Sequence, residues 1–156
     1  QGGSAAYPVR PQDCSDCRAF SNDFNIMSDG LGACSGGGTC QVSGSLLTPL
    51  TALKTELANN DINWQITEAW PPTVSHQATC HRAGTCIDAN FWGSNATVAN
   101  IDKFANAADK SGLRAEYEVQ TQSQADAIKS GLPAGSATIV KVVPQISAPH
   151  FSVYKK

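Results

Sequence analysis

The sequence predicts an α+β fold, in which an antiparallel sheet is flanked by helices and preceded by an irregular arm. Apolar residues recur at helical spacing over residues 46–57 and 98–108. Apolar and polar residues alternate, as in half-buried strands, over residues 62–67 and 113–119. Residues 1–44 are rich in Gly, Ser and Asp and show little periodicity, so they predict no long regular element.

Length and composition limit the choice of domain organisation and partner. The chain has 156 residues, enough for one domain with a hydrophobic core. We expect the arm over residues 1–44 and the folded domain over residues 45–156. Charged residues are only 15% of the chain, the net charge is −2 and no basic block occurs, so nucleic acid is not an expected partner. No apolar run approaches the length of a membrane span.

The cysteines form three close pairs. The pairs are Cys14 and Cys17, Cys34 and Cys40, and Cys80 and Cys86. An even count with local spacing favours one disulfide within each pair and an oxidising compartment. We therefore expect a secreted protein, extracellular or at the cell surface, whose signal peptide was removed before Gln1. The alternative is a reduced protein in which cysteine thiolates hold a structural zinc ion, because the first pair has the spacing of half a zinc knuckle.

The arm over residues 1–44 contains one cluster of large apolar residues. Its members are Phe20, Phe24, Ile26 and Met27. This cluster could anchor the arm against its own domain, with the disulfides holding the arm in place. The alternative is that it contacts a neighbouring molecule, so that the protein self-associates through the arm.

The first predicted helix carries a leucine stripe over residues 46–57. Thr48 and Pro49 are expected as its N-cap and first helical residue. Asn59 and Asn60 end it. The half-buried strand over residues 62–67 then leads to the central stretch of the chain.

The second half of the chain alternates between helices and strands. We expect a helix over residues 97–111, a strand over residues 113–119 and a short helix that Ser123 caps. The β-branched run over residues 138–143 suits a central strand buried on both faces. A last short strand begins near His150, and residues 89–94 are expected to form a loop.

Two histidines and an aspartate form a candidate metal site. His81 and Asp88 are seven residues apart in the central stretch, and His150 opens the last predicted strand. Two imidazole nitrogens and one carboxylate oxygen suit Zn²⁺ with one position left open. The alternative is a disulfide-pinned loop whose histidines are solvated.

Two short motifs resemble those of a known family. The stretch from His81 to Asp88 reads H-R-A-G-T-C-I-D, similar to the H-x-x-G-x-A-[VI]-D signature of the LAS metallopeptidases. Pro149-His150-Phe151 is similar to their C-terminal P-H-F segment. The family includes D-Ala-D-Ala carboxypeptidases, L-alanyl-D-glutamate endolysins and, as a relative in fold, the hedgehog signalling domain. The resemblance covers about residues 46–154 and not the arm.

The resemblance implies a hedgehog/DD-peptidase-like fold and a Zn²⁺ cofactor. By this resemblance the zinc ligands are His81, Asp88 and His150, with water in the fourth position. The implied activity is a DD- or LD-peptidase, and the implied partners are peptidoglycan or its stem peptides. Zinc would acidify the water and polarise the scissile carbonyl.

The sequence departs from this family at the catalytic base. Family members usually carry Asp or Glu three residues before the last histidine, where this chain has Ser147. The candidate bases are Glu68 and His76. If it is not the base, Glu68 would be a solvated residue at a strand end. His76 would instead support a zinc ligand by a hydrogen bond or be the fourth zinc ligand. Two functions follow: a secreted zinc peptidase, or a non-catalytic extracellular subunit that binds the cell wall or self-assembles through residues 1–44.

Overall fold

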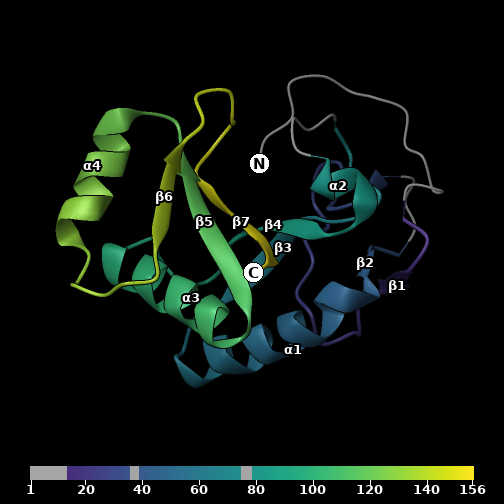
Figure 1. Cartoon of the computed structure of the whole chain (residues 1–156). Helices are drawn as coiled ribbons and strands as arrows, with labels where there is room; N and C mark the ends of the chain where they lie inside the picture. The colour runs from purple at the N-terminus through teal and green to yellow at the C-terminus, as the bar shows by residue number, and fades with distance from the viewer. Residues whose placement is uncertain (1–13, 36–38, 75–78) are drawn as a thin grey trace.

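The computed structural model describes residues 14–35, 39–74 and 79–156 and shows the predicted α+β fold. Helices cover a five-stranded sheet whose strand order is β3-β4-β7-β5-β6 (Figure 1). The strands are β3 (Trp64–Glu68), β4 (Cys86–Phe91), β5 (Leu113–Val119), β6 (Ile139–Val142) and β7 (His150–Lys155). Neighbouring strands are antiparallel except for β5 and β6, which are parallel. The last strand of the chain is therefore the central strand of the sheet.

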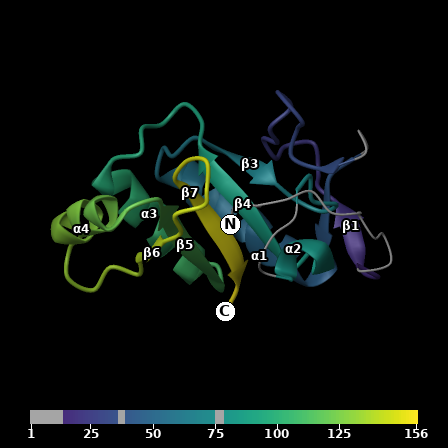
Figure 2. The same ribbon diagram turned by 90° about the horizontal axis from the view of Figure 1, so that it is seen from above.

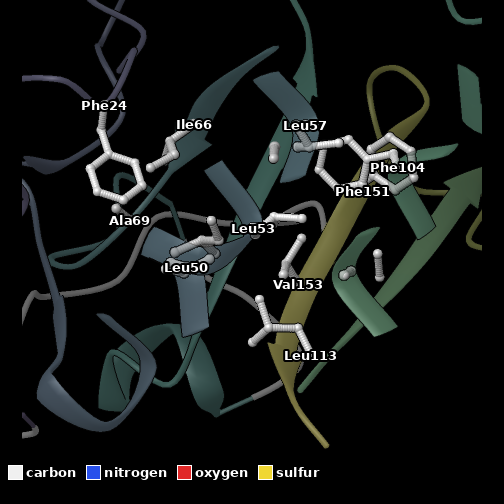
Figure 3. Packing of buried hydrophobic residues seen from close by; sticks show 14 of the residues in the cluster. Phe24, Leu50, Leu53, Leu57, Ile66, Ala69, Phe104, Leu113, Phe151 and Val153 are labelled. Carbon is white, nitrogen blue, oxygen red and sulfur yellow. The ribbon is translucent and has the colours of Figure 1, made fainter. Parts of the chain in front are cut away.

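Two long helices pack together on the sheet and form the core with it. The helices are α1 (Gly44–Asn59), α2 (Cys80–Ala83), α3 (Val98–Lys110) and α4 (Gln122–Gly131). Both views show α1 and α3 close together and α4 beside β6 (Figures 1 and 2). Leu50, Leu53 and Leu57 of α1 are fully buried, and the rings of Phe104 on α3 and Phe151 on β7 stack 3.9 Å apart (Figure 3). This core fixes which face of β7 is turned away from the helices.

The first helix begins earlier than predicted. Its N-cap is Ser43, whose hydroxyl accepts a hydrogen bond from the Ser45 amide, and Pro49 lies inside the helix. The chain enters α1 directly from the short strand β2 (Gln41–Ser43). Proline removes one helical hydrogen bond, but burial of the leucine stripe offsets that loss.

Three other local predictions are wrong. The short helix α4 is capped by Thr121 and not by Ser123, which lies inside it. The β-branched run forms β6, which lies at the edge of the sheet and is only partly buried. It pairs in parallel with β5 because the crossover through α4 brings the chain back in the same direction. The first half of the expected loop over residues 89–94 is instead strand: β4 continues to Phe91, where pairing with Trp64 of β3 holds it extended.

The described part of the arm packs on its own domain. Strand β1 (Cys17–Ala19) pairs with β2, and Phe20 and Phe24 are buried in the main core. All three predicted disulfides are present and no cysteine is free, which rules out the alternative of a reduced protein with a zinc ion held by cysteine thiolates. Within the described residues, no helix is long and apolar enough to cross a membrane.

Candidate metal centre

Two residues of the central stretch meet a residue from near the end of the sequence. His81 belongs to α2, Asp88 to β4 and His150 to the first position of β7. Nε2 of His81 lies 3.4 Å from Oδ1 of Asp88, and Nε2 of His150 lies 3.6 Å from Oδ2 of the same carboxylate. The imidazoles of His81 and His150 therefore both approach the buried carboxylate of Asp88.

The turn after α2 explains the glycine in the motif. Gly84 ends α2 with φ of +70°, a conformation that glycine adopts at little cost. A Cβ atom at this position would lie 2.5 Å from Sγ of Cys17 and 2.8 Å from Sγ of Cys14. The Gly84 carbonyl also accepts a hydrogen bond from the Ser43 amide at 2.8 Å. The first disulfide of the arm thus packs directly against the loop that carries His81.

Two further contacts fix His81. The indole of Trp70 donates a 2.9 Å hydrogen bond to the carbonyl of Arg82, the next residue. The Cys80–Cys86 disulfide joins the start of α2 to the start of β4. Because these contacts hold the backbone on both sides of His81, its ring is oriented before any ligand binds.

His150 is oriented by its own loop. Its Nδ1 donates a hydrogen bond to the carbonyl of Ala148 at 2.9 Å, which leaves Nε2 facing the carboxylates. The amide of Asn90 donates to the Pro149 carbonyl at 3.1 Å. The amide of Gln120 donates to the Ser147 carbonyl at 3.0 Å. Side chains of the strand β4 and of the segment that follows β5 therefore clamp the segment that leads into His150.

The structure adds one residue that the sequence analysis missed. Glu118 is directly opposite His150 in the pairing of β5 with β7, and its Oε1 lies 3.1 Å from Nε2 of His150. Only 2% of the Glu118 surface is exposed. Its place on the polar side of an alternating strand was a signal in the sequence. The pairing that brings it to His150 was not, because thirty residues, 120–149, separate β5 from β7.

Two buried carboxylates concentrate negative charge at the histidines. Burial by itself raises the pKa of Asp88, but the hydrogen bond and charge of His81 and the charge of His150 hold that pKa well below its usual range. Burial likewise raises the pKa of Glu118, and its hydrogen bond with His150 helps to bring that pKa below the ordinary value. Both groups are therefore ionised near neutral pH, which favours a cation between them and the histidines.

The nitrogen and oxygen donors of this site are of the types that zinc binds. In a tetrahedral zinc site with bonds of about 2.1 Å, neighbouring ligand atoms are about 3.4 Å apart. Nε2 of His81 lies 3.4 Å from Oδ1 of Asp88 and Nε2 of His150 lies 3.6 Å from Oδ2, so each histidine is at this spacing from a different oxygen of the carboxylate. A backbone carbonyl that accepts a hydrogen bond from the other ring nitrogen, as the Ala148 carbonyl does from Nδ1 of His150, fixes the orientation of a metal-binding imidazole.

A second group of potential ligand atoms overlaps this one. Ligand atoms of Cys80, His81 and Cys86 lie within 4.8 Å of one another and could hold a metal ion. Metal binding by cysteine requires the thiolate, however, and these two sulfurs form a disulfide. In the disulfide-bonded protein, the Asp88 carboxylate is therefore the better partner for His81.

The prediction of the catalytic base also concerned Glu68, Ser147 and His76. Glu68 is buried rather than solvated, accepts a 2.6 Å hydrogen bond from the Thr73 amide and lies opposite Asp88 in the pairing of β3 with β4. Burial raises the pKa of Glu68 to about 7, although the Thr73 hydrogen bonds oppose this shift. Ser147 is exposed. His76 lies outside the described residues.

Comparisons with protein-family models, curated proteins and solved structures found no match for this chain. The geometry of the site and the two motifs are therefore the basis for inferring a function.

Proposed function

We propose that the protein is a secreted zinc-dependent peptidase in which His81, Asp88 and His150 hold the metal and Glu118 is the general base. The observation that carries this proposal is the buried Glu118 carboxylate, 3.1 Å from Nε2 of His150. It supplies the acidic group that is absent at Ser147. Two of the three disulfides contact or close the loop of His81, as suits a site that works outside the cell.

The chain's own residues would perform the proton transfers. Zinc, when bound, would supply a Lewis acid that polarises the scissile carbonyl. Glu118 accepts a proton from the attacking water on a carboxylate oxygen and then delivers it to the leaving amine nitrogen. Gln120, Asn90 and the Ala148 carbonyl keep His150 in place while this happens, so the base and the ligand retain their separation.

The substrate class rests on the motif resemblance. The H-x-x-G-x-x-x-D spacing that ends at Asp88 and the P-H-F segment around His150 are similar to those of the LAS peptidases. We propose peptidoglycan stem peptides as the substrates on this ground. The three disulfides support the matching location, because stem peptides occur outside the membrane.

One observation favours a second function. The Glu118 oxygen is at least as close to Nε2 of His150 as the Asp88 oxygen is, at 3.1 Å against 3.6 Å. Glu118 could therefore be a fourth ligand that closes the site, and closed zinc sites are structural. The protein would then be a non-catalytic extracellular subunit that binds the cell wall or self-assembles through residues 1–44.

One pair of variants separates the two functions. Glu118→Gln keeps the shape of the side chain and removes its charge, and Glu116→Gln is the matched control two residues away on the same strand. Each protein is loaded with zinc and incubated with a synthetic stem pentapeptide. Zinc content and hydrolysis products are both measured by mass spectrometry.

The outcomes are distinct. If Glu118 is the base, Glu118→Gln keeps its zinc and loses about 10²–10⁴-fold in rate, while Glu116→Gln resembles the wild type. If Glu118 is a ligand, Glu118→Gln loses zinc. A wild-type protein that holds zinc and cleaves no stem peptide would contradict the peptidase proposal and support the non-catalytic subunit.

A further inference from the structure

Trp92 is unusually exposed for a tryptophan. It lies just after β4, and 57% of its surface is exposed. Tryptophan offers a large apolar face and a hydrogen-bonding edge, a combination that proteins use at binding surfaces. Trp92 follows the end of β4 that is opposite the Cys80–Cys86 disulfide.

The turn that carries Trp92 is fixed to the neighbouring strand. The Trp92 amide donates to the Asn63 carbonyl at 3.1 Å, and the Asn63 amide donates to the Ser94 hydroxyl at 2.9 Å. Gly93 between them has φ of +97°, and a Cβ there would lie 3.2 Å from Cβ of Asn63. Because this packing leaves the turn little freedom, the backbone of Trp92 is oriented in advance.

Trp92 borders a hollow of about 400 Å³ with mixed walls. The aromatic part of the wall comes from Trp92, Trp64 and Phe24. The polar part includes the amides of Asn25 and Asn63. The amide of Asn25 donates to the Trp64 carbonyl at 3.3 Å, which fixes the arm against β3 at this point.

Lys54 is the one cationic side chain among the described residues that line the hollow, and it is already neutralised. Lys54 forms an ion pair with Asp23, and its ammonium group lies 4.7 Å from the centre of the Phe24 ring. The hollow therefore offers no positive charge in excess for a phosphate or a nucleic acid. Its amide groups do not suit a lipid chain either, because their hydrogen bonds with water would be lost.

We propose that this hollow is a carbohydrate-binding site for a β-1,4-linked pyranose oligosaccharide, with one sugar ring stacked on Trp92. A pyranose with equatorial substituents has an apolar face of C–H groups that matches an indole. Its hydroxyl groups lie at the ring edge, where Asn25, Asn63 and Asp23 can exchange hydrogen bonds with them. None of the lining residues belongs to the metal centre, so this site is independent of the proposed hydrolysis.

The binding test uses the indole N–H signals in ¹⁵N–¹H NMR spectra of the full chain. Cellohexaose and chitohexaose are the probes, and α-linked maltohexaose is the control ligand. We expect a saturable shift of the Trp92 signal with one or both β-linked probes. The Trp70 signal is an internal control, because its buried indole N–H donates to the Arg82 carbonyl.

Two variants complete the test. Trp92→Ala should weaken binding by about tenfold or more, whereas Trp92→Phe should retain part of it. Leu31→Ala is the matched control, because Leu31 is the other large hydrophobic residue exposed within the described part of the chain, at 79%, and does not line the hollow. No shift with either β-linked probe, an equal response to maltohexaose, or wild-type affinity in Trp92→Ala would overturn the proposal.

Discussion

Glu118 and His150 are directly opposite each other on β5 and β7, and Oε1 of Glu118 lies 3.1 Å from Nε2 of His150. Since Nδ1 of His150 donates to the Ala148 carbonyl, Nε2 is the nitrogen that faces both Glu118 and Asp88. A neutral imidazole would present a lone pair to these carboxylates. A proton or a metal ion at this nitrogen removes the repulsion between the lone pair and the carboxylate oxygens. Metal binding should therefore compete with protons.

Gly84→Ala should destabilise the protein more than an ordinary change at a left-handed glycine. The control is Gly112→Ala, because Gly112 has φ of +82° and an added Cβ there would meet nothing within 4 Å. The control should lose about 1 kcal/mol of unfolding free energy from its backbone conformation alone. At Gly84 the clash with the Cys14–Cys17 disulfide should add about 1–3 kcal/mol. Urea unfolding measures both, and equal losses would show that the disulfide does not pack on this loop.

The disulfide beside His81 should support zinc binding as well as stability. Cys80→Ser with Cys86→Ser removes it, and Cys34→Ser with Cys40→Ser is the matched control, since both pairs have a sequence separation of 6. Each double variant should lose about 2 kcal/mol of unfolding free energy from loop entropy. Only the first should also bind zinc more weakly, as measured by competition with a chelating dye. Equal zinc affinity in both variants would mean that the disulfide does not orient His81.

Glu68 should make stability depend on pH. Its pKa is raised from 4.5 to about 7 in the folded protein, so its favourable contribution is complete below pH 4.5 and is lost as the pH rises through about 7. Relative to the wild type, Glu68→Gln should therefore gain stability over this interval, by up to about 3 kcal/mol. Urea unfolding of both proteins with a chelator present, at several pH values, measures the difference. A difference that does not change with pH would contradict the buried state of Glu68.

Strand pairing between residues distant in the sequence separates what the sequence could predict from what it could not. The leucine stripe of α1, the alternation in β5 and the three disulfides depend on residues close in sequence, and these predictions are confirmed. The edge position of β6 and the extension of β4 to Phe91 depend on distant partners. Apolar and β-branched composition does not specify those partners.

In the candidate site, too, residues within motifs could be predicted and residues placed by long-range pairing could not. The two motifs predicted that His81, Asp88 and His150 belong together, and the structure places Nε2 of His81 and Nε2 of His150 3.4 and 3.6 Å from oxygens of the Asp88 carboxylate. Glu118 has no motif around it, so only its position opposite His150 identifies it. Glu68 looked like a solvated strand end because its cover comes from Thr73 and from pairing with β4.

The most direct test of the account is the zinc content of the purified protein. Wild type, His81→Ala, His150→Ala and the exposed-carboxylate control Asp126→Asn are saturated with zinc, dialysed and analysed by inductively coupled plasma mass spectrometry. We expect about one zinc per chain in the wild type and the control, and almost none in either histidine variant. A wild type that retains no zinc, or histidine variants that retain as much as the wild type, would contradict the proposed metal centre.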